Sequence, residues 1–467
     1  MSAAFTAPAV SAAAPASGSE ELRALLRLAA PLVGANILQM AVYAVDVVFA
    51  ARLGTVEFAA ATLGVHLFSI ALWALIGLTG AAAPLIAAEL GARKHAVREV
   101  RRSFRMALWL SVVAGAPFML LFAHGEGLLL AAGQDAAVAA RADAFLDILL
   151  WSIVPAIAAS VMRNAAAALG CPGYAMVVNA LALGVAVLAN WLLVFGNAGF
   201  PALGLEGSAL ASLITSVAML AAYALILLLD PRLRRYRLFG RWWRPEWTRF
   251  REIIRIGVPI AFTLTFEGAL FGGASFLMGL IGVTEVAAHA VALNIAAVAF
   301  QIPFGVAQAA TIRVGMAYGA ADRLWIARAG WAALGVGVGF MALTAVAIYA
   351  APSLFVSAYL DSTAANARAA ALAVQFLLVA AMFQLFDGGQ AVAAGVLRGL
   401  QDTRVPMIIA GIGYWGAGFG SAVLLGFGLG WGGLGVWIGL AVGLFVVAGA
   451  LFWRWAARER LGLLPAR

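Results

Sequence analysis

The sequence contains one cysteine, Cys171, and one lysine, Lys94, among 467 residues. A single cysteine can form neither an internal disulfide bond nor a multi-cysteine metal site. The four histidines show no ligand spacing, so we expect no transition-metal site and no other cofactor. Lys94 follows Arg93 and not a glycine, so the Gly-Lys loop that binds phosphate is absent, which argues against an ATP-driven function.

Charged residues are scarce as well. They make up 11% of the sequence, against about 25% in soluble domains, while 64% of the residues are hydrophobic and the mean hydropathy is +1.00. Apolar runs of about 20 residues can cross a membrane as helices. Twelve such runs predict an all-α polytopic membrane protein, with spans that begin near residues 25, 59, 103, 142, 173, 206, 252, 286, 326, 370, 405 and 432.

The net charge of +9 is concentrated in alternate connections. Arginines gather between spans 2 and 3, between spans 6 and 7, and after spans 8, 10 and 12, whereas only Arg52, Arg141 and Arg368 fall in the other connections. Basic connections mark the cytoplasmic side of a membrane protein. We therefore expect a bacterial-type inner-membrane protein with both termini in the cytoplasm, whose arginines determine topology and do not bind nucleic acid.

The two halves of the sequence repeat each other. A shift of 228 residues places Pro31 on Pro259 and Gln39 on Glu267, so the twelve predicted helices form two pseudo-symmetric six-helix bundles, as in transporters with parallel repeats. The expected parts are a disordered cytoplasmic tail (1–22), an N-terminal lobe (23–230), a basic cytoplasmic linker (231–251), a C-terminal lobe (252–456) and a cytoplasmic tail (457–467).

Three carboxylates lie inside predicted spans: Glu267 near the middle of span 7, Asp387 in span 10 and Asp46 towards the outer end of span 1. An acid at the centre of a membrane helix costs about 2.5–3.5 kcal/mol, so such residues face a protein cavity and mark ion or substrate pathways. These acids are the candidate sites for a proton or cation.

Polar side chains accompany the acids at helical spacing. They are Gln39 and Tyr43 on the face of Asp46, Asn190 in span 5, Thr263 one turn before Glu267, Asn294, Gln301 and Gln308 at seven-residue steps in span 8, and Gln384 with Gln390 on either side of Asp387. Amides of this kind can also simply hold helices together. We interpret the set as the lining and support of a substrate cavity.

One acidic pattern in the sequence could instead indicate a membrane enzyme. Asp143 and Asp147 form a D-x-x-x-D pattern, which occurs in the Mg²⁺-diphosphate sites of membrane prenyltransferases. A second such motif is missing, and the pair lies at the non-cytoplasmic end of span 4. The pattern therefore does not favour an enzyme.

The order and spacing of four stretches resemble the multidrug and toxic compound extrusion (MATE) family of cation-coupled exporters. These stretches are Pro31 to Asp46, Val286 to Asn294, Ile312 to Gly315, and QLFDGGQAVAAGVLRG at 384–399. The resemblance extends from about Leu22 to Arg454. It implies a fold of two six-helix lobes around a central cavity.

The resemblance also implies export of small cationic or amphipathic molecules against inward H⁺ or Na⁺, by a monomer that contacts membrane lipids. Glu267 and Asp387 match the family's second-lobe acids, and Asp46 with Asn190 matches its first-lobe pair, so Na⁺ at either pair is the alternative to a proton. Two positions depart from the pattern: Ala186 replaces an asparagine, and Phe383 replaces a tyrosine beside Gln384. Alanine at position 186 removes a possible oxygen ligand for Na⁺, so this departure favours coupling to protons. A lipid-linked oligosaccharide flippase of the same superfamily is the alternative function.

Overall fold

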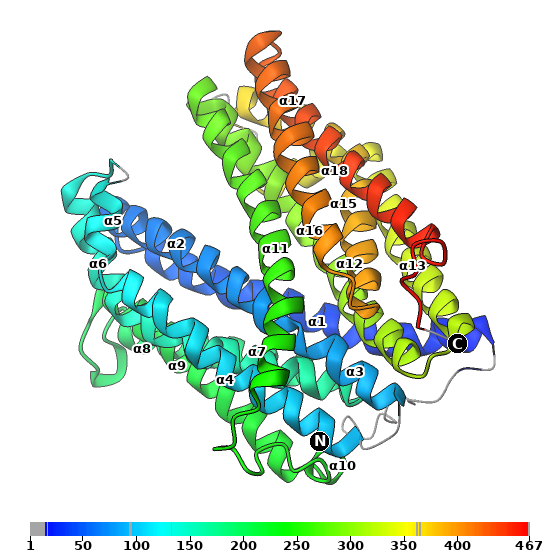
Figure 1. The fold of residues 1–467 in the computed structure, drawn as a ribbon. Helices are drawn as coiled ribbons and strands as arrows, with labels where there is room; N and C mark the ends of the chain where they lie inside the picture. Colours follow the sequence, from blue (N-terminus) through cyan, green and yellow to red (C-terminus); the bar gives the residue numbers. More distant parts are fainter. Residues whose placement is uncertain are drawn as a thin grey trace. The chain divides into compact units, whose positions relative to one another are not determined.

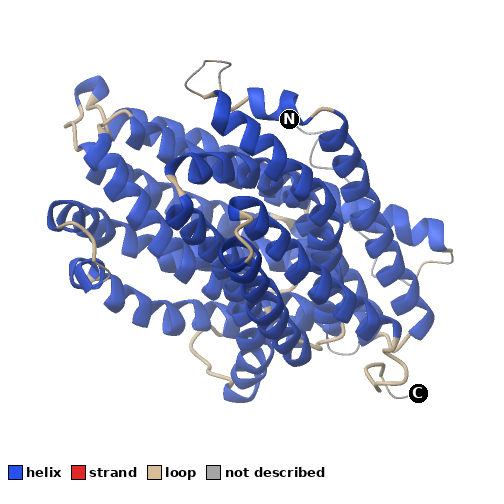
Figure 2. Cartoon of the chain, turned by 90° about the horizontal axis from the view of Figure 1, so that it is seen from above, coloured by secondary structure: helices blue, strands red, loops and turns tan. Residues whose placement is uncertain are grey.

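The computed structural model describes residues 15, 17–92, 96–131, 133–360, 363 and 366–465. Within these ranges the regular elements are all helical (Figures 1 and 2), and twelve helical segments are long and apolar enough to cross a membrane. The all-α polytopic fold is thereby confirmed. The segments begin at the predicted positions or up to seven residues earlier, because charged residues that were assigned to connections already belong to the first helical turns.

The helices of the first half precede the basic linker, apart from a last short helix at the start of the linker. They are α1 (Gly18–Ala51), α2 (Thr55–Gly80), α3 (Ala82–Ala92), α4 (Ala96–Phe122), α5 (Gly125–Ala131), α6 (Ala136–Leu149), α7 (Ile153–Ala168), α8 (Gly173–Leu193), α9 (Gly204–Leu229) and the short α10 (Pro231–Arg234). Two of the spans are composite, since α2 continues into α3 and α6 into α7. The tail expected over residues 1–22 lies mostly outside the described residues, and residues 18–22 belong to α1.

The second half follows the linker. Its helices are α11 (Trp247–Ile281), α12 (Val283–Gly319), α13 (Arg323–Ala350), α14 (Pro352–Ser357), α15 (Ala367–Gly399), α16 (Arg404–Gly411), α17 (Gly420–Val423) and α18 (Gly432–Ala456). The π-helical segments η4 (Ile412–Phe419) and η5 (Leu424–Gly428) join α16 and α17 into one span. π-helical turns inside α-helices occur frequently at functional sites.

The chain forms two compact units. Among the described residues, unit 1 holds 34–261, and unit 2 holds 15, 17–33 and the residues from 262 on. The two boundaries, at 33/34 and 261/262, are 228 residues apart, the same shift that relates the sequence halves. Each of α1 and α11 therefore begins in one unit and ends in the other. That the lobes 23–230 and 252–456 move as two bodies remains a prediction.

Unit 1 is built around α7, which packs against α2, α3, α4 and α9. Apolar residues of α2, α6 and α7 contribute to a buried cluster that includes Phe68, Phe145 and Ile157. The first half of α11 crosses α2 at Gly257, where an added Cβ would lie 2.1 Å from the carbonyl oxygen of Leu78. Small residues at such crossings allow membrane helices to approach closely.

In unit 2 the central helix is α15, which packs against α12, α13 and α18; these helices lie side by side in Figure 1. A Cβ at Gly395 would lie 2.5 Å from the carbonyl oxygen of Ala307, so only glycine permits this approach of α15 to α12. The first half of α1 makes a similar crossing, since a Cβ at Gly305 would lie 2.5 Å from Val33 Cγ2.

Ion pairs fix the first halves of α1 and α11. Glu21 accepts hydrogen bonds from Arg313 Nε at 2.9 Å and Trp325 Nε1 at 3.0 Å, and both charged side chains are at most 1% exposed. In unit 1, Arg249 of α11 pairs with Glu89 of α3 at 2.6 Å and with Glu99 at 3.0 Å. The placement of Arg313 in the connection after span 8 is therefore wrong: it lies inside α12, as a buried partner of Glu21.

Candidate functional site

Two of the predicted acids share one hydrogen-bond network in unit 2. Glu267 comes from the second half of α11, and Asp387 and Gln390 come from α15, one helical turn apart. The Gln390 amide Nε2 donates to Glu267 Oε1 at 2.9 Å and lies 3.5 Å from Asp387 Oδ1. Asp387 is 4% exposed. One amide nitrogen thus bridges two carboxylates within a membrane-spanning segment.

Tyr414 completes this network and was not predicted. Its hydroxyl donates to Gln390 Oε1 at 2.9 Å, and the side chain is fully buried. Tyr414 lies in the π-helical segment η4. A tyrosine inside an otherwise apolar span was the available signal, because a buried phenol needs a hydrogen-bond partner.

A second unpredicted residue, Arg398, lies in the last turn of α15. Its charge acts on Glu267 and on Tyr414. The arginine was counted among the cytoplasmic residues that set topology, which concealed its electrostatic effect on Glu267.

Other predicted residues of unit 2 surround the acids. Gln384 is fully buried and accepts a hydrogen bond from Thr344 Oγ1 at 3.1 Å, while its own Nε2 has no partner among the described residues. Phe383 packs against Trp437 with ring centroids 5.6 Å apart. Thr263 is 6% exposed. The face of α15 that carries Asp387 is therefore a buried polar layer bounded by aromatic rings.

The polar residues of α12 do not join the acids through hydrogen bonds. Asn294 is exposed and donates to the carbonyl oxygen of Ala290, and Gln301 donates to that of Ala297, both within the same helix. Gln308 has a buried Oε1 without a partner among the described residues.

Asp46 forms a separate site in unit 1. Asn190 Nδ2 of α8 donates to Asp46 Oδ1 at 2.9 Å, and Ser212 Oγ of α9 donates to Asp46 Oδ2 at 2.7 Å. The predicted pairing with Asn190 is present. Ser212 was missed, because α9 also carries Ser208, Thr215 and Ser216 and the sequence does not show which of these hydroxyl groups faces an acid. Both carboxylate oxygens are held by donors from two neighbouring helices.

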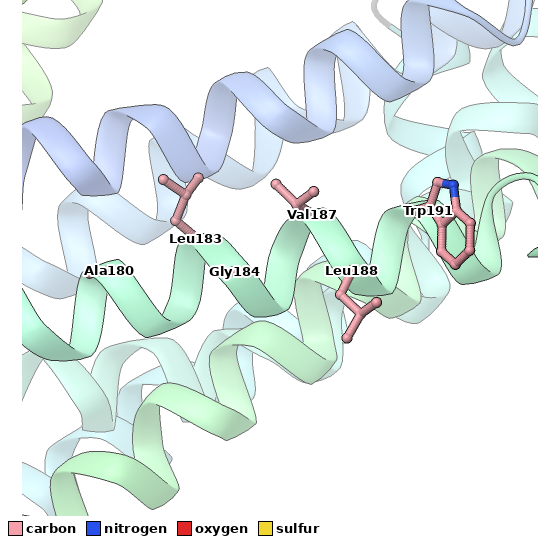
Figure 3. A pocket seen from close by; sticks show the side chains of 6 residues that line it. All are labelled: Ala180, Leu183, Gly184, Val187, Leu188 and Trp191. Atoms are coloured by element: carbon pink, nitrogen blue, oxygen red, sulfur yellow. The ribbon is translucent and has the colours of Figure 1, made fainter.

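Gln39 and Tyr43 lie on α1 before Asp46, and neither side chain has a hydrogen bond to another described residue; Tyr43 is 44% exposed. An apolar groove of about 590 Å³ follows α8 and is lined by Ala180, Leu183, Gly184, Val187, Leu188 and Trp191. In Figure 3, Leu183 and Val187 point to one side of α8 and Leu188 to the other. Leu183 packs beside Val42 of α1.

The fold and these sites define the class of the protein. It is a duplicated twelve-helix membrane protein with carboxylates inside its spans, which is the construction of a membrane transporter. Asp143, weighed above for a prenyltransferase, accepts a hydrogen bond from the backbone nitrogen of Glu126 at 2.8 Å.

Comparisons with known proteins agree with this class. The MatE family model matches residues 31–192 and 259–424, two ranges that begin 228 residues apart. The chain is 47% identical over 443 residues, 95% of each protein, to a protein of Mesorhizobium japonicum named "Probable multidrug resistance protein NorM". It is 44% identical to a protein of Brucella suis with the same name, over 93% of each chain.

Solved structures share the fold. A structure titled as the outward-facing conformation of a multidrug resistance MATE family transporter superposes with a TM-score of 0.84 at 19% identity, covering 96% of this chain and 97% of the other. The eukaryotic MATE transporter AtDTX14 gives 0.83 at 20% identity, covering 96% and 99%. The chain belongs to the MatE family of membrane transporters. It is a multi-pass membrane protein and not an enzyme.

Proposed function

We propose that this chain is a secondary active multidrug exporter, which antiports small organic cations or amphipathic drugs against H⁺ or Na⁺ by alternating access between the lobes 23–230 and 252–456. The observation that carries the proposal is the pair of carboxylates, Glu267 and Asp387, bridged by the Gln390 amide. The relatives named as multidrug resistance proteins support it.

The carboxylate pair suits a coupling site for a physical reason. Two carboxylates that share a site in a medium of low dielectric constant are costly to ionise together, so uptake of one proton or cation relieves their repulsion. A cationic substrate relieves the same repulsion. Ion and substrate therefore compete for one electrostatic site, and entry of the ion weakens the hold on the drug.

The donor pattern favours a proton over Na⁺. In both units the carboxylate oxygens face N–H and O–H donors, from Gln390 in unit 2 and from Asn190 and Ser212 in unit 1. A hard cation needs several oxygen ligands instead. Asn190 Oδ1, which has no partner among the described residues, and Ser212 Oγ are two further oxygens beside Asp46. Na⁺ at Glu267 and Asp387, or at Asp46 and Asn190, is the alternative that the experiment below tests.

The charge distribution supports a proposal for the membrane in which the exporter lies and for its orientation. The arginine-rich connections support a place in the inner membrane of a bacterial cell with both termini in the cytoplasm. We propose that one chain transports as a monomer in contact with membrane lipids.

Efflux from proteoliposomes tests this function. A cationic fluorescent dye is loaded and a pH gradient or a Na⁺ gradient is applied separately, for the wild type, Glu267→Gln and Asp387→Asn. The control is Glu285→Gln, which makes the same change at an acid that pairs with the exposed Arg368. We expect efflux with the pH gradient, lost in both site variants and kept in the control.

Three other outcomes would contradict the proposal. Efflux with Na⁺ alone would overturn proton coupling, and full activity of both site variants would overturn the assignment of the acids. If neither gradient moved any organic cation, the exporter would be rejected for this substrate class. Transfer of a lipid-linked oligosaccharide, the flippase alternative, would then be assayed in the same vesicles.

A further inference from the structure

We infer that the start of α4 and the basic linker together bind the head group of an anionic phospholipid. The surface consists of Arg101, Arg102 and Arg105 on α4 with Arg244 on the linker, and is called the basic surface below. It lies in unit 1 and shares no residue with the site of Asp46.

The linker is fastened along α4 by specific contacts. Arg105 donates to the carbonyl oxygen of Arg241 at 2.9 Å, Trp109 Nε1 donates to that of Trp242 at 3.1 Å, and the two indole rings stack with centroids 6.3 Å apart. The backbone at Arg241 is left-handed, with φ of 57°, a conformation that non-glycine residues rarely adopt. The surface is therefore a built one, with its loop held against the helix.

The positive charge on this surface exceeds the negative charge beside it. Arg101, Arg102 and Arg244 lie close enough to Arg105 for their charges to act on it. Glu246 pairs with Arg102 and Arg105, and Glu99 pairs with Arg102. Neither Arg101 nor Arg244 has a carboxylate partner among the described residues. Four guanidinium groups thus share two carboxylates, one of which also binds Arg249.

A buried donor points to a missing acceptor at the same place. Arg105 is 2% exposed, and its Nε has no hydrogen-bond partner among the described residues. Buried N–H groups nearly always have a partner. A phosphate oxygen supplies such an acceptor, and arginine guanidinium groups bind phosphate in a bidentate manner.

Exposed tryptophans identify the source of the phosphate as a lipid. Trp243 is 74% exposed, Trp247 60% and Trp242 39%, and all three lie on the linker or at the first residue of α11. Tryptophan side chains concentrate at the head-group layer of a membrane. Clusters of four or more basic residues next to a membrane helix are typical of anionic lipid binding. An inorganic phosphate ion would have no use for the exposed indoles.

The test is lipid retention by the purified full-length protein. Native mass spectrometry counts the phosphatidylglycerol and phosphatidylcholine molecules that remain bound to the wild type and to Arg101→Gln/Arg244→Gln. The control, Arg23→Gln/Arg27→Gln, removes two charges from exposed arginines of α1. The more conservative Arg101→Lys/Arg244→Lys keeps the charge, and a thermal melt in detergent verifies that each variant is folded.

We expect the wild type and the control to retain phosphatidylglycerol in preference to phosphatidylcholine. The glutamine variant should bind phosphatidylglycerol about fivefold more weakly for each arginine removed, since one basic residue near an anionic surface contributes about a factor of five, and the lysine variant should lie between. Equal retention by the glutamine variant would overturn the site. Displacement of the lipid by sodium phosphate at similar concentration would show a site for a free anion and overturn the lipid assignment.

Discussion

Glu21 and Arg249 occupy equivalent positions in the two halves of the sequence, and each anchors the first half of its helix by an ion pair of opposite polarity. Glu21 of α1 pairs with Arg313 in α12, and Arg249 of α11 pairs with Glu89 in α3. The partners lie within one helical turn of equivalent positions. If the first half of α1 packed on α3 instead, Glu21 would face the like charge of Glu89, so the reversed polarity selects the correct pairing.

The two ion pairs should differ in their contribution to stability. Glu21→Gln removes the carboxylate that pairs with the buried Arg313, and breaking such a buried ion pair costs about 3–5 kcal/mol. Arg249→Gln should cost about 1–2 kcal/mol, because the side chains of Arg249 and Glu89 are 16% and 12% exposed. Thermal unfolding in detergent micelles measures the difference. A smaller loss of Tm for Glu21→Gln than for Arg249→Gln would contradict this ranking.

The crossing of α11 with α2 depends on a glycine. Gly257→Ala places a methyl group against the backbone of Leu78, and we expect the helices to separate at a cost of about 1–3 kcal/mol. Gly268→Ala is the control on the same helix, since no atom lies within 4 Å of its added Cβ. The melting temperatures should fall for the first variant and stay or rise slightly for the second. Similar values for both would show that the crossing tolerates a side chain.

Tyr414 should support the carboxylates through Gln390. Tyr414→Phe removes the hydroxyl that donates to Gln390 Oε1 and leaves a buried carbonyl without that donor, a loss of about 1–3 kcal/mol. Given the proposed function, dye efflux should drop about tenfold and not vanish as in Glu267→Gln. Tyr349→Phe, at a residue 70% exposed, should transport like the wild type. Unchanged efflux in Tyr414→Phe would separate the tyrosine from the transport site.

Asp230 should make the protein sensitive to acid at the end of span 6. Burial opposes ionisation of this carboxyl, but hydrogen bonds from Arg232 and Tyr174 outweigh it and lower the pKa of Asp230 from 3.8 to about 2. A depressed pKa stabilises the folded state above pH 3.8, and this stabilisation is lost as the pH falls through about 2.

The fall of the melting temperature between pH 4 and pH 2 should therefore be shallower in Asp230→Asn than in the wild type. Asp135→Asn changes the N-cap of α6 in a similar way, without an arginine partner among the described residues, and should follow the wild type. A slope in Asp230→Asn as steep as that of the wild type would exclude this carboxyl as a source of acid sensitivity.

Much of the fold could be predicted because its signals are local. Twelve apolar runs, a shift of 228 residues and three acids within the spans are visible in the sequence. The position of Asp46 beside Asn190 was also predicted, although from a family resemblance and not from spacing. What local patterns cannot give is the partner of a side chain. Ser212 is one of several hydroxyl residues in α9, and Tyr414 lies in a largely apolar span; only packing brings the two side chains to an acid.

Arg313 shows that the partner of a charged side chain cannot be read from local sequence patterns either. By hydropathy it is a cation near the end of a span, typical of a cytoplasmic connection, whereas its partner Glu21 is distant in the sequence. The boundaries of the two units illustrate it again, because they fall inside the continuous helices α1 and α11, two residues after Pro31 and Pro259, and not at the linker.

The passage of α1 between units has a consequence for biosynthesis. Glu21 emerges from the ribosome early, but Arg313 is made 292 residues later, so the first half of α1 must wait in the membrane for most of translation before it can dock. Contacts so distant in sequence are slow to form. Until then an unpaired acid lies at the start of the first helix, and we expect nascent chains truncated before α12 to be recognised as incomplete and degraded.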